Sequence, residues 1–169
     1  MSTCHSYISC AVAASLQMGL HRSVVTTNLD PIECETRKRV FWTVRNMESY
    51  VCTLLGFPKT IGDEDIDQDL PLEVDDEYIT EEGIMPMPNG QVSMIAATNA
   101  HTKLVQILAK VVRHVYPVKG MIRGISGKSG SYMVSYAKVC EVEHDLQEWR
   151  ENLAWDLGPD ADVPAGFLR

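Results

Sequence analysis

The residues best suited to binding a metal ion are four aspartates spaced two apart: Asp63, Asp65, Asp67 and Asp69. A calcium loop of the EF-hand type needs such acids, together with a glycine at its sixth position and a bidentate glutamate at its twelfth. Counted from Asp65, those positions hold Leu70 and Asp76, and counted from Asp63 they hold Gln68 and Val74. The sequence therefore favours a role other than calcium binding for these acids.

Thiol and imidazole groups are the next candidates for metal binding. The cysteines are Cys4, Cys10, Cys34, Cys52 and Cys140, and the histidines are His5, His21, His101, His114 and His144. No Cys-x-x-Cys pair and no pair of histidines four residues apart is present, so the sequence does not support a zinc site in this chain. We expect reduced and mostly buried thiols, as in an intracellular, reducing environment.

Groups for nucleophilic or phosphate chemistry are also missing from the sequence. Gly127-Lys128-Ser129 resembles the end of a phosphate-binding loop, but Ile122 stands where the loop needs its first glycine. No Gly-x-Ser-x-Gly or His-Glu-x-x-His motif occurs. We therefore predict that the chain is not an enzyme and holds no cofactor.

Charge is distributed unevenly along the chain. Its 169 residues include 15 lysines and arginines and 23 acids, a formal charge of −8. Between Thr60 and Thr102 there are eleven carboxylates and no lysine or arginine, so the remainder is slightly basic. Nucleic-acid binding requires a clustered basic face, and a membrane helix needs roughly 18–20 apolar residues. We expect neither direct nucleic-acid contact nor a membrane span, and the first residues lack the basic start of a signal peptide.

Helical periodicity and capping residues predict the helices that position these residues. A first helix is predicted over residues 4–18, ending at Gly19. A second begins after the N-cap Asp30 and ends before Gly56, and Glu33 at the third helical position completes a pattern like a capping box. Its predicted core stripe is Val40, Val44, Met47, Val51 and Leu54. The pairs Glu33–Arg37 and Glu35–Arg39 are predicted to lie on its outer face.

The second half of the chain predicts two more helices. Residues 59–89 show no period and are expected to form an ordered, acidic wrap with short helical turns. The third helix is predicted over 93–116, with a stripe of Leu104, Val105, Leu108, Val111, Val112 and Val115. A loop over 117–130 precedes a fourth helix over 131–155, with one face formed by Tyr132, Tyr136, Val139, Leu146, Trp149 and Leu153. The fold class is an irregular all-α domain of about four helices, three of them long.

Four motifs in order resemble a known family. They are Met18-Gly19-Leu20-His21-Arg22, Glu35-Thr36-Arg37-Lys38-Arg39-Val40-Phe41-Trp42, Leu55-Gly56-Phe57-Pro58 and Asp63-Glu64-Asp65-Ile66-Asp67 with Leu70-Pro71. This arrangement is similar to the fungal-specific transcription factor domain, the middle homology region of fungal zinc-cluster (six-cysteine, binuclear) transcription factors. The family usually has a tryptophan pair where Phe41-Trp42 stands, and an Asp-Arg pair where Glu48-Ser49 stands.

The resemblance implies a regulatory domain of a nuclear transcription factor, over residues 1–157 with a frayed tail over 158–169. It implies that zinc belongs only to a separate N-terminal DNA-binding module, so that the chain is an excerpt or a truncated relative. The motif residues are expected to be mainly structural, with the Trp42 helix organising the core, residues 61–71 packed across it, and the acids after the Gly-x-Pro turn capping helix N-termini. Expected partners are other parts of the factor or transcriptional co-regulators.

Two alternative functions are also consistent with the sequence. The first alternative is a small-molecule sensor, with a pocket between the second, third and fourth helices. The second is a truncated interaction module without DNA binding. The ligand-binding residues are unknown at this stage. Incomplete helix faces predict an exposed apolar patch and self-association.

Overall fold

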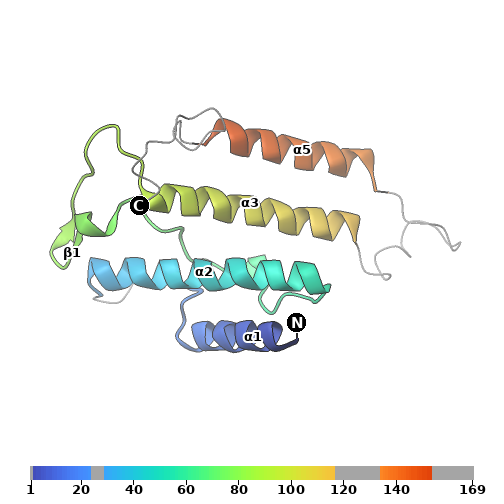
Figure 1. Cartoon of the computed structure of the whole chain (residues 1–169), viewed down its shortest axis with the longest axis horizontal. Helices are drawn as coiled ribbons and strands as arrows, with labels where there is room; N and C mark the ends of the chain where they lie inside the picture. Colours follow the sequence, from blue (N-terminus) through green and yellow to red (C-terminus); the bar gives the residue numbers. More distant parts are fainter. Residues whose placement is uncertain (1, 24–28, 117–133, 154–169) are drawn as a thin grey trace, which may run out of the picture.

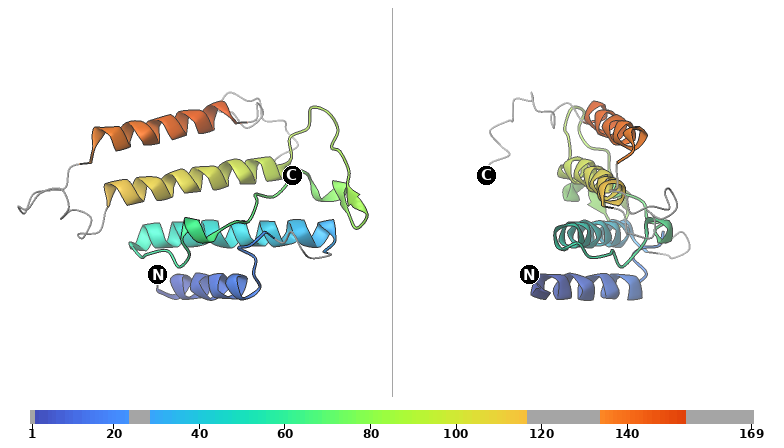
Figure 2. Two further views of the ribbon diagram at one scale, coloured as in Figure 1. Left: turned by 180° about the vertical axis from the view of Figure 1, so that it is seen from behind. Right: turned by 90° about the vertical axis from the view of Figure 1, so that its right-hand side faces the viewer.

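The computed structural model of this chain describes residues 2–23, 29–116 and 134–153. Its four described helices are α1 (Ser2–Gln17), α2 (Pro31–Leu55), α3 (Met94–Val115) and α5 (Tyr136–Glu151). Each helix packs against the next one in chain order, as Figure 1 shows. In the right-hand view of Figure 2, α2 and α3 are seen nearly end-on while α1 runs across them. The all-α fold class predicted from the sequence is confirmed.

Helix α2 begins and ends where its capping residues predict. Asp30 Oδ1 accepts a hydrogen bond of 2.7 Å from Glu33 N, and Pro31 occupies the first turn. At the other end Gly56 is left-handed, with φ 69°, and its N–H donates to Cys52 O. Only glycine adopts this conformation without strain, which explains why the helix stops there.

Helix α1 ends in a Schellman motif, as predicted for Gly19. Gly19 has φ 67° and its N–H donates to Leu16 O over 3.0 Å, while Leu20 N donates to Ser15 O over 2.9 Å. This turn directs the Leu20 side chain inward, where it is 2% exposed. The helix begins at Ser2, two residues earlier than predicted.

The segment between α2 and α3, residues 57–92, is named the acidic linker here. It contains the predicted short helical turns, at Asp63–Asp65 and Asp76–Tyr78. It also contains a hairpin that was not predicted, in which β1 (Ile79–Thr80) pairs antiparallel with β2 (Gly83–Ile84), Ile79 opposite Ile84. Strands of two residues are too short to show the alternation by which a strand is recognised in a sequence.

The predicted core stripe of α2 is wrong at three of its five positions, whereas Val44 and Val51 are half-buried. Val40, Met47 and Leu54 are 44%, 52% and 82% exposed. The buried face of α2 is instead mostly polar: Glu35, Phe41, Trp42, Arg45, Asn46, Glu48, Ser49 and Cys52. Glu35, Arg45, Asn46 and Glu48 each have a hydrogen-bond partner outside α2, which offsets the cost of burying them.

The faces predicted for the last two helices also need correction. The buried residues of α3 are Ala96, Asn99, Thr102 and Val105. Val105 belongs to the predicted stripe, whereas the predicted Val115 is exposed. Within the described part of α5 no residue is fully buried, and Tyr136 is 81% exposed. The predicted Tyr132 and the loop over 117–130 lie outside the described residues, as does the tail over 158–169. Of the helices in the described ranges, none has the length and hydropathy of a transmembrane span.

Candidate functional site

An aromatic cluster on α2 fixes the acidic linker across that helix. The cluster joins residues from three segments: Leu20, Phe41, Trp42, Ile66 and Leu70. The rings of Phe41 and Trp42 meet edge to face, with their centroids 5.3 Å apart. Trp42 Nε1 donates a hydrogen bond of 2.8 Å to Asp69 O. The linker is therefore held by both apolar packing and a directed hydrogen bond.

Glu35 lies inside the fold and not on an outer face. It is 3% exposed, and its Oε2 accepts a hydrogen bond of 2.8 Å from Leu72 N. Its Oε1 accepts from Lys38 Nζ over 2.9 Å. The predicted pair with Arg39 is wrong, because this carboxylate is used to hold the backbone of the acidic linker.

The two arginines of the basic motif reach in opposite directions from α2. Arg37 Nη2 donates to Met18 O over 2.9 Å, at the end of α1. Arg39 donates to Val74 O over 3.0 Å and forms an ion pair with Asp76. Arg37 is thus paired with α1 and not with Glu33, and the motif ties α2 to its neighbours on both sides.

A buried ion-pair network lies one to two turns further along α2. Arg45 donates to Glu48 Oε2 over 2.8 Å and to Asp63 Oδ1 over 2.7 Å. Glu48 Oε1 accepts from Thr60 N over 2.6 Å, and Arg113 of α3 donates to Asp63 Oδ2 over 3.2 Å. The side chains of Arg45 and Glu48 are only 5% and 2% exposed. This Arg45 network joins α2, α3 and the acidic linker.

The charges of the Arg45 network shift the pKa values of two nearby groups. Burial alone would raise the pKa of Asp63, but Lys59, Arg45 and Arg113 outweigh it and hold that pKa below its usual range. The pKa of Lys59 is lowered, first by burial and then by the neighbouring Arg45. The carboxylates of Asp63 and Glu48 act in the opposite direction on the pKa of Lys59 and do not offset this lowering.

The Gly-Leu-His-Arg motif pairs with the middle of the acidic linker. Gln68 Nε2 donates to Leu20 O over 2.8 Å and to Arg22 O over 3.0 Å. His21 O accepts from Asp67 N, and the Asp67 side chain accepts from Ser23 N over 2.8 Å. Arg22 forms an exposed ion pair with Asp67 at 3.6 Å. The motif therefore contributes mainly backbone carbonyl groups, two of which accept hydrogen bonds from the Gln68 side chain.

The Leu-Pro end of the linker lies against α3. Pro71 is buried, and its carbonyl accepts a hydrogen bond of 2.8 Å from Asn99 Nδ2. Further on, Asp75 Oδ1 accepts from Met94 N over 3.0 Å at the start of α3, so an acid of the linker does cap a helix N-terminus. Asp65 is exposed. The described ranges contain no group of three or more His, Cys, Asp or Glu that could hold a metal ion.

The Gly-x-Pro turn closes against α2 itself. Cys52 Sγ donates to Pro58 O over 3.5 Å, and Phe57 N donates to Cys52 O over 3.0 Å. Burial and then the charge of Glu48 raise the pKa of the Cys52 thiol, which keeps it protonated as a donor. The turn thus places Lys59 directly beside the Arg45 network.

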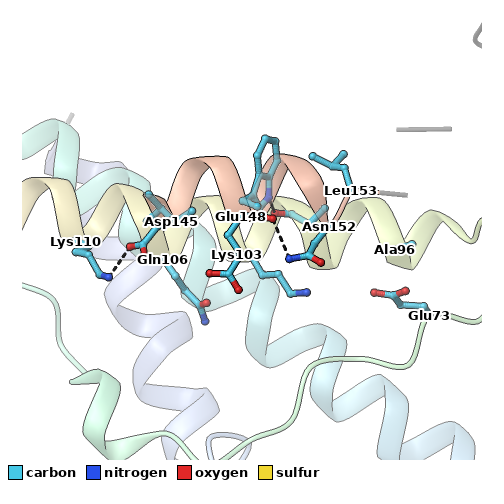
Figure 3. A pocket seen from close by; sticks show the side chains of 12 residues that line it. Glu73, Ala96, Lys103, Gln106, Lys110, Asp145, Glu148, Asn152 and Leu153 are labelled. Atoms are coloured by element: carbon cyan, nitrogen blue, oxygen red, sulfur yellow. Dashed lines mark hydrogen bonds and ion pairs between the residues drawn. The ribbon is translucent and has the colours of Figure 1, made fainter. Parts of the chain in front are cut away.

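Two cavities adjoin these contacts. The first, of about 500 Å³, lies between α3 and α5 and is shown in Figure 3. Lys110 of α3 binds Asp145 of α5 at its edge over 2.5 Å, and this hydrogen bond raises the pKa of Lys110. Trp149 Nε1 donates to Ala100 O over 2.7 Å, which fixes α5 against α3. The lining of this first cavity combines acids, lysines and amides, so it favours neither an anionic nor a cationic ligand.

The second cavity, of about 370 Å³, lies between α2, α3 and the acidic linker and is named the α2–α3 cavity here. The lining residues of this cavity include Trp42, Arg45, Lys59, Asp63, Val105 and Arg113. Both cavities include Gln106 and Lys110, so they meet at α3. A pocket between the second, third and fourth helices was predicted, whereas the structure divides that space into two.

Sequence reasoning missed the polar residues that connect α2 to its neighbours. Asn46 Nδ2 donates to Thr102 Oγ1 over 2.9 Å, and Thr102 is 1% exposed. Glu48 was noted only as a departure from a family pattern, yet it forms a buried ion pair. The spacing of Arg45 and Glu48, three residues apart on a helix, is the signal that would have indicated this pair.

The helices and contacts define an all-α domain in which charged residues of α2 bind the acidic linker and the turn that follows α1. The chain belongs to the fungal specific transcription factor domain family, which matches residues 2–151. No solved structure matches it.

The similar curated proteins are regulators of transcription in fungi. The chain is 38% identical over 168 residues to "Activator of stress genes protein 1" of Candida albicans, covering 94% of this chain and 17% of that protein. It is 36% identical to "Activator of stress genes 1" of Saccharomyces cerevisiae, covering 96% and 16%. It is 34% identical to "Transcriptional activator protein acu-15" of Neurospora crassa, covering 89% and 15%. The chain thus spans about a sixth of the length of these relatives.

Proposed function

We propose that this chain is the regulatory region of a fungal zinc-cluster transcription factor and acts through contacts within the factor, with transcriptional co-regulators or with a small effector. The observation that carries the proposal is that the family motifs bind the chain itself. Glu35 and Trp42 hold the acidic linker across α2, and Asp63 of the linker motif binds Arg45 of α2. Their role is therefore structural, and they keep a helical platform rigid for such contacts.

The remaining functional assignments follow from the same proposal. The factor acts in the nucleus, and DNA contact and zinc binding belong to a module separate from this chain. The chain is not an enzyme, since its similar proteins are regulators of transcription. Residues 1–157 form the regulatory region.

The surface available for partner contacts includes the outer face of α2. Val40, Met47 and Leu54 are exposed along one side of that helix. Self-association, other parts of the factor and co-regulators are the contacts that we propose for such a surface, because clustered exposed apolar side chains favour association. Sedimentation velocity of the purified chain tests self-association, and a concentration-independent monomer would contradict it.

A reporter assay tests the regulatory role. The chain is placed between a heterologous DNA-binding domain and an activation domain, and reporter transcription is measured in yeast. We expect the wild-type chain to change reporter output relative to a Gly/Ser linker of equal length. Arg45→Met, which breaks the buried network, should abolish this change.

The matched control is Glu81→Gln, which alters one exposed residue of the linker. It should behave as the wild type, with fusion abundance checked by immunoblot. Equal reporter output from the wild-type chain and the Gly/Ser linker, at equal abundance, would refute the proposed function.

A further inference from the structure

We propose that the α2–α3 cavity binds a small organic anion carrying carboxylate or phosphate groups, held by Lys59 and Arg113. Binding of the anion does not depend on the proposed regulatory function, whereas an effect of that binding on transcription does. Three features carry it: the size of the cavity, its mixed apolar and cationic lining, and an unbalanced positive charge.

The size and lining of the cavity suit a compact ligand. Its volume of about 370 Å³ is within the range of small-molecule sites. Trp42, Ile66 and Val105 supply apolar wall, while Asn46 and Gln106 supply amide groups. A ligand with a short carbon skeleton would contact the apolar wall and direct its charged groups toward the cations.

The charges around the cavity do not balance. Arg45 is already bonded to Glu48 and Asp63, and Asp63 is shared with Arg113. Lys59 forms none of the ion pairs found among residues 2–23, 29–116 and 134–153. In the described part of the chain, Arg45, Lys59 and Arg113 thus lie beside two carboxylates, Glu48 and Asp63, an excess of one positive charge. Lys110 also lines the cavity, but its ammonium group is paired with Glu141 and Asp145.

The environment of Lys59 destabilises the charged form of its side chain. Burial and the adjacent Arg45 lower its pKa, so the charged ammonium is less stable there than in water. A bound anion would pair with that ammonium and relieve the repulsion between Lys59 and Arg113. Arg113 is largely exposed, so it is free to reorient its remaining donors toward such a ligand.

The surroundings of the cavity select a small anion over a large one. The eleven carboxylates between Thr60 and Thr102 repel an extended polyanion such as a nucleic acid or an anionic membrane. A compact anion would contact only the groups that line the cavity, among them Lys59 and Arg113. Carboxylates and phosphates both match a guanidinium and an ammonium group, and the experiment below distinguishes them.

Binding is tested on the full chain by thermal shift and isothermal titration calorimetry. The probes are succinate, citrate and inorganic phosphate, each at constant ionic strength adjusted with potassium chloride, because salt alone screens the network. We expect a saturable rise in Tm and a single-site isotherm with at least one probe. Succinamide, a neutral analogue of succinate, should give no shift. A preference for phosphate or for the carboxylates identifies the class of the natural ligand.

Variants connect the binding to Lys59. Lys59→Gln should weaken binding at least about tenfold, because one charge-assisted hydrogen bond is lost, and Lys59→Arg should retain it. Lys103→Gln is the matched control, since Lys103 is exposed and lines the other cavity. Circular dichroism checks that each variant is folded.

Two results would overturn the proposal. One is the absence of any saturable shift with all three anions, and the other is undiminished binding by folded Lys59→Gln. These outcomes are separate from those of the reporter assay. Anion binding with no regulatory effect would refute the proposed function alone, and a regulatory effect without anion binding would refute the cavity alone.

Discussion

Removing Arg45 should destabilise the domain strongly. In Arg45→Met the carboxylate of Glu48, only 2% exposed, would keep a single hydrogen bond, from Thr60 N. Breaking a buried ion pair by removing one partner costs about 3–5 kcal/mol, because the other charge is left uncompensated. Domains of this kind are stable by about 5–15 kcal/mol, so the variant should retain a small margin or unfold.

Two further variants separate burial from charge. Asp63→Asn removes a partner whose side chain is 57% exposed, and it should cost about 1 kcal/mol or less. The double variant Arg45→Met with Glu48→Gln removes both buried charges and keeps an acceptor for Thr60 N. It should be more stable than Arg45→Met alone, because no isolated charge remains inside.

Urea unfolding at neutral pH, followed by far-ultraviolet circular dichroism, measures these differences. The slope of the unfolding free energy with urea should be similar in all variants, so that the midpoints report stability. Arg22→Gln is a control, since its ion pair with Asp67 is exposed on both sides. The reasoning is refuted when Arg45→Met costs no more than Asp63→Asn, or when the two substitutions of the double variant are additive.

Two other predictions follow from single contacts. Trp42→Phe keeps an aromatic ring in the core but loses the hydrogen bond to Asp69 O, and it should cost about 1 kcal/mol in urea unfolding; an unchanged midpoint would contradict the anchoring role. Asp63 has a pKa below its usual range when folded, because Lys59, Arg45 and Arg113 outweigh the effect of burial. Its charge therefore contributes stability above its unfolded pKa of about 3.9, and that contribution is lost as pH falls through the lower folded pKa. Asp63→Asn should accordingly show a shallower loss of Tm on acidification below about pH 5 than the wild type, and parallel curves would exclude this linkage.

The ends of the helices could be predicted because their signals are local. Asp30 and Glu33 are three residues apart, and Gly19 and Gly56 need no partner beyond their own turns to end α1 and α2. A cap depends on one backbone conformation and on one or two hydrogen bonds within a single turn. Such information is present in the neighbouring residues of the sequence.

The buried faces could not be predicted from periodicity, because their partners are far along the chain. Glu35 is buried because Leu72 N reaches it, and Asn46 is buried because Thr102 lies opposite. Periodicity assigns polar residues to the solvent and therefore selected the stripe of Val40, Met47 and Leu54. The resemblance to a family corrected this partly, since its motif includes Glu35 and the arginines.

The α2–α3 cavity was out of reach for the same reason. Lys59, Asp63 and Arg113 are far apart in sequence, and only the packing of α3 on α2 brings them together. The sequence identified Asp63 only as part of an acidic run and of a family motif, and it ruled against a calcium loop there. In the structure Asp63 instead binds two arginines, and it lines the cavity together with Lys59.

The path of the acidic linker is fixed by buried carboxylates of α2 and not by the exposed ion pairs of its own acids. Exposed pairs such as Arg22–Asp67 contribute little, so they cannot fix the path of the linker alone. The buried carboxylates of α2 do so, because Glu48 accepts from Thr60 N and Glu35 accepts from Leu72 N.

The linker is thus anchored by its backbone at residues 60 and 72, on either side of the Asp63–Leu70 stretch. Lys59 precedes the first anchor directly, so an anion held by Lys59 would act on the residue next to the Glu48 contact. The proposed ligand would therefore weaken or strengthen the hydrogen bond from Thr60 N to Glu48, which helps to position Asp63 between Arg45 and Arg113. Lys59 and the Thr60 anchor are joined by a single peptide bond, so ligand binding at Lys59 can affect that anchor directly.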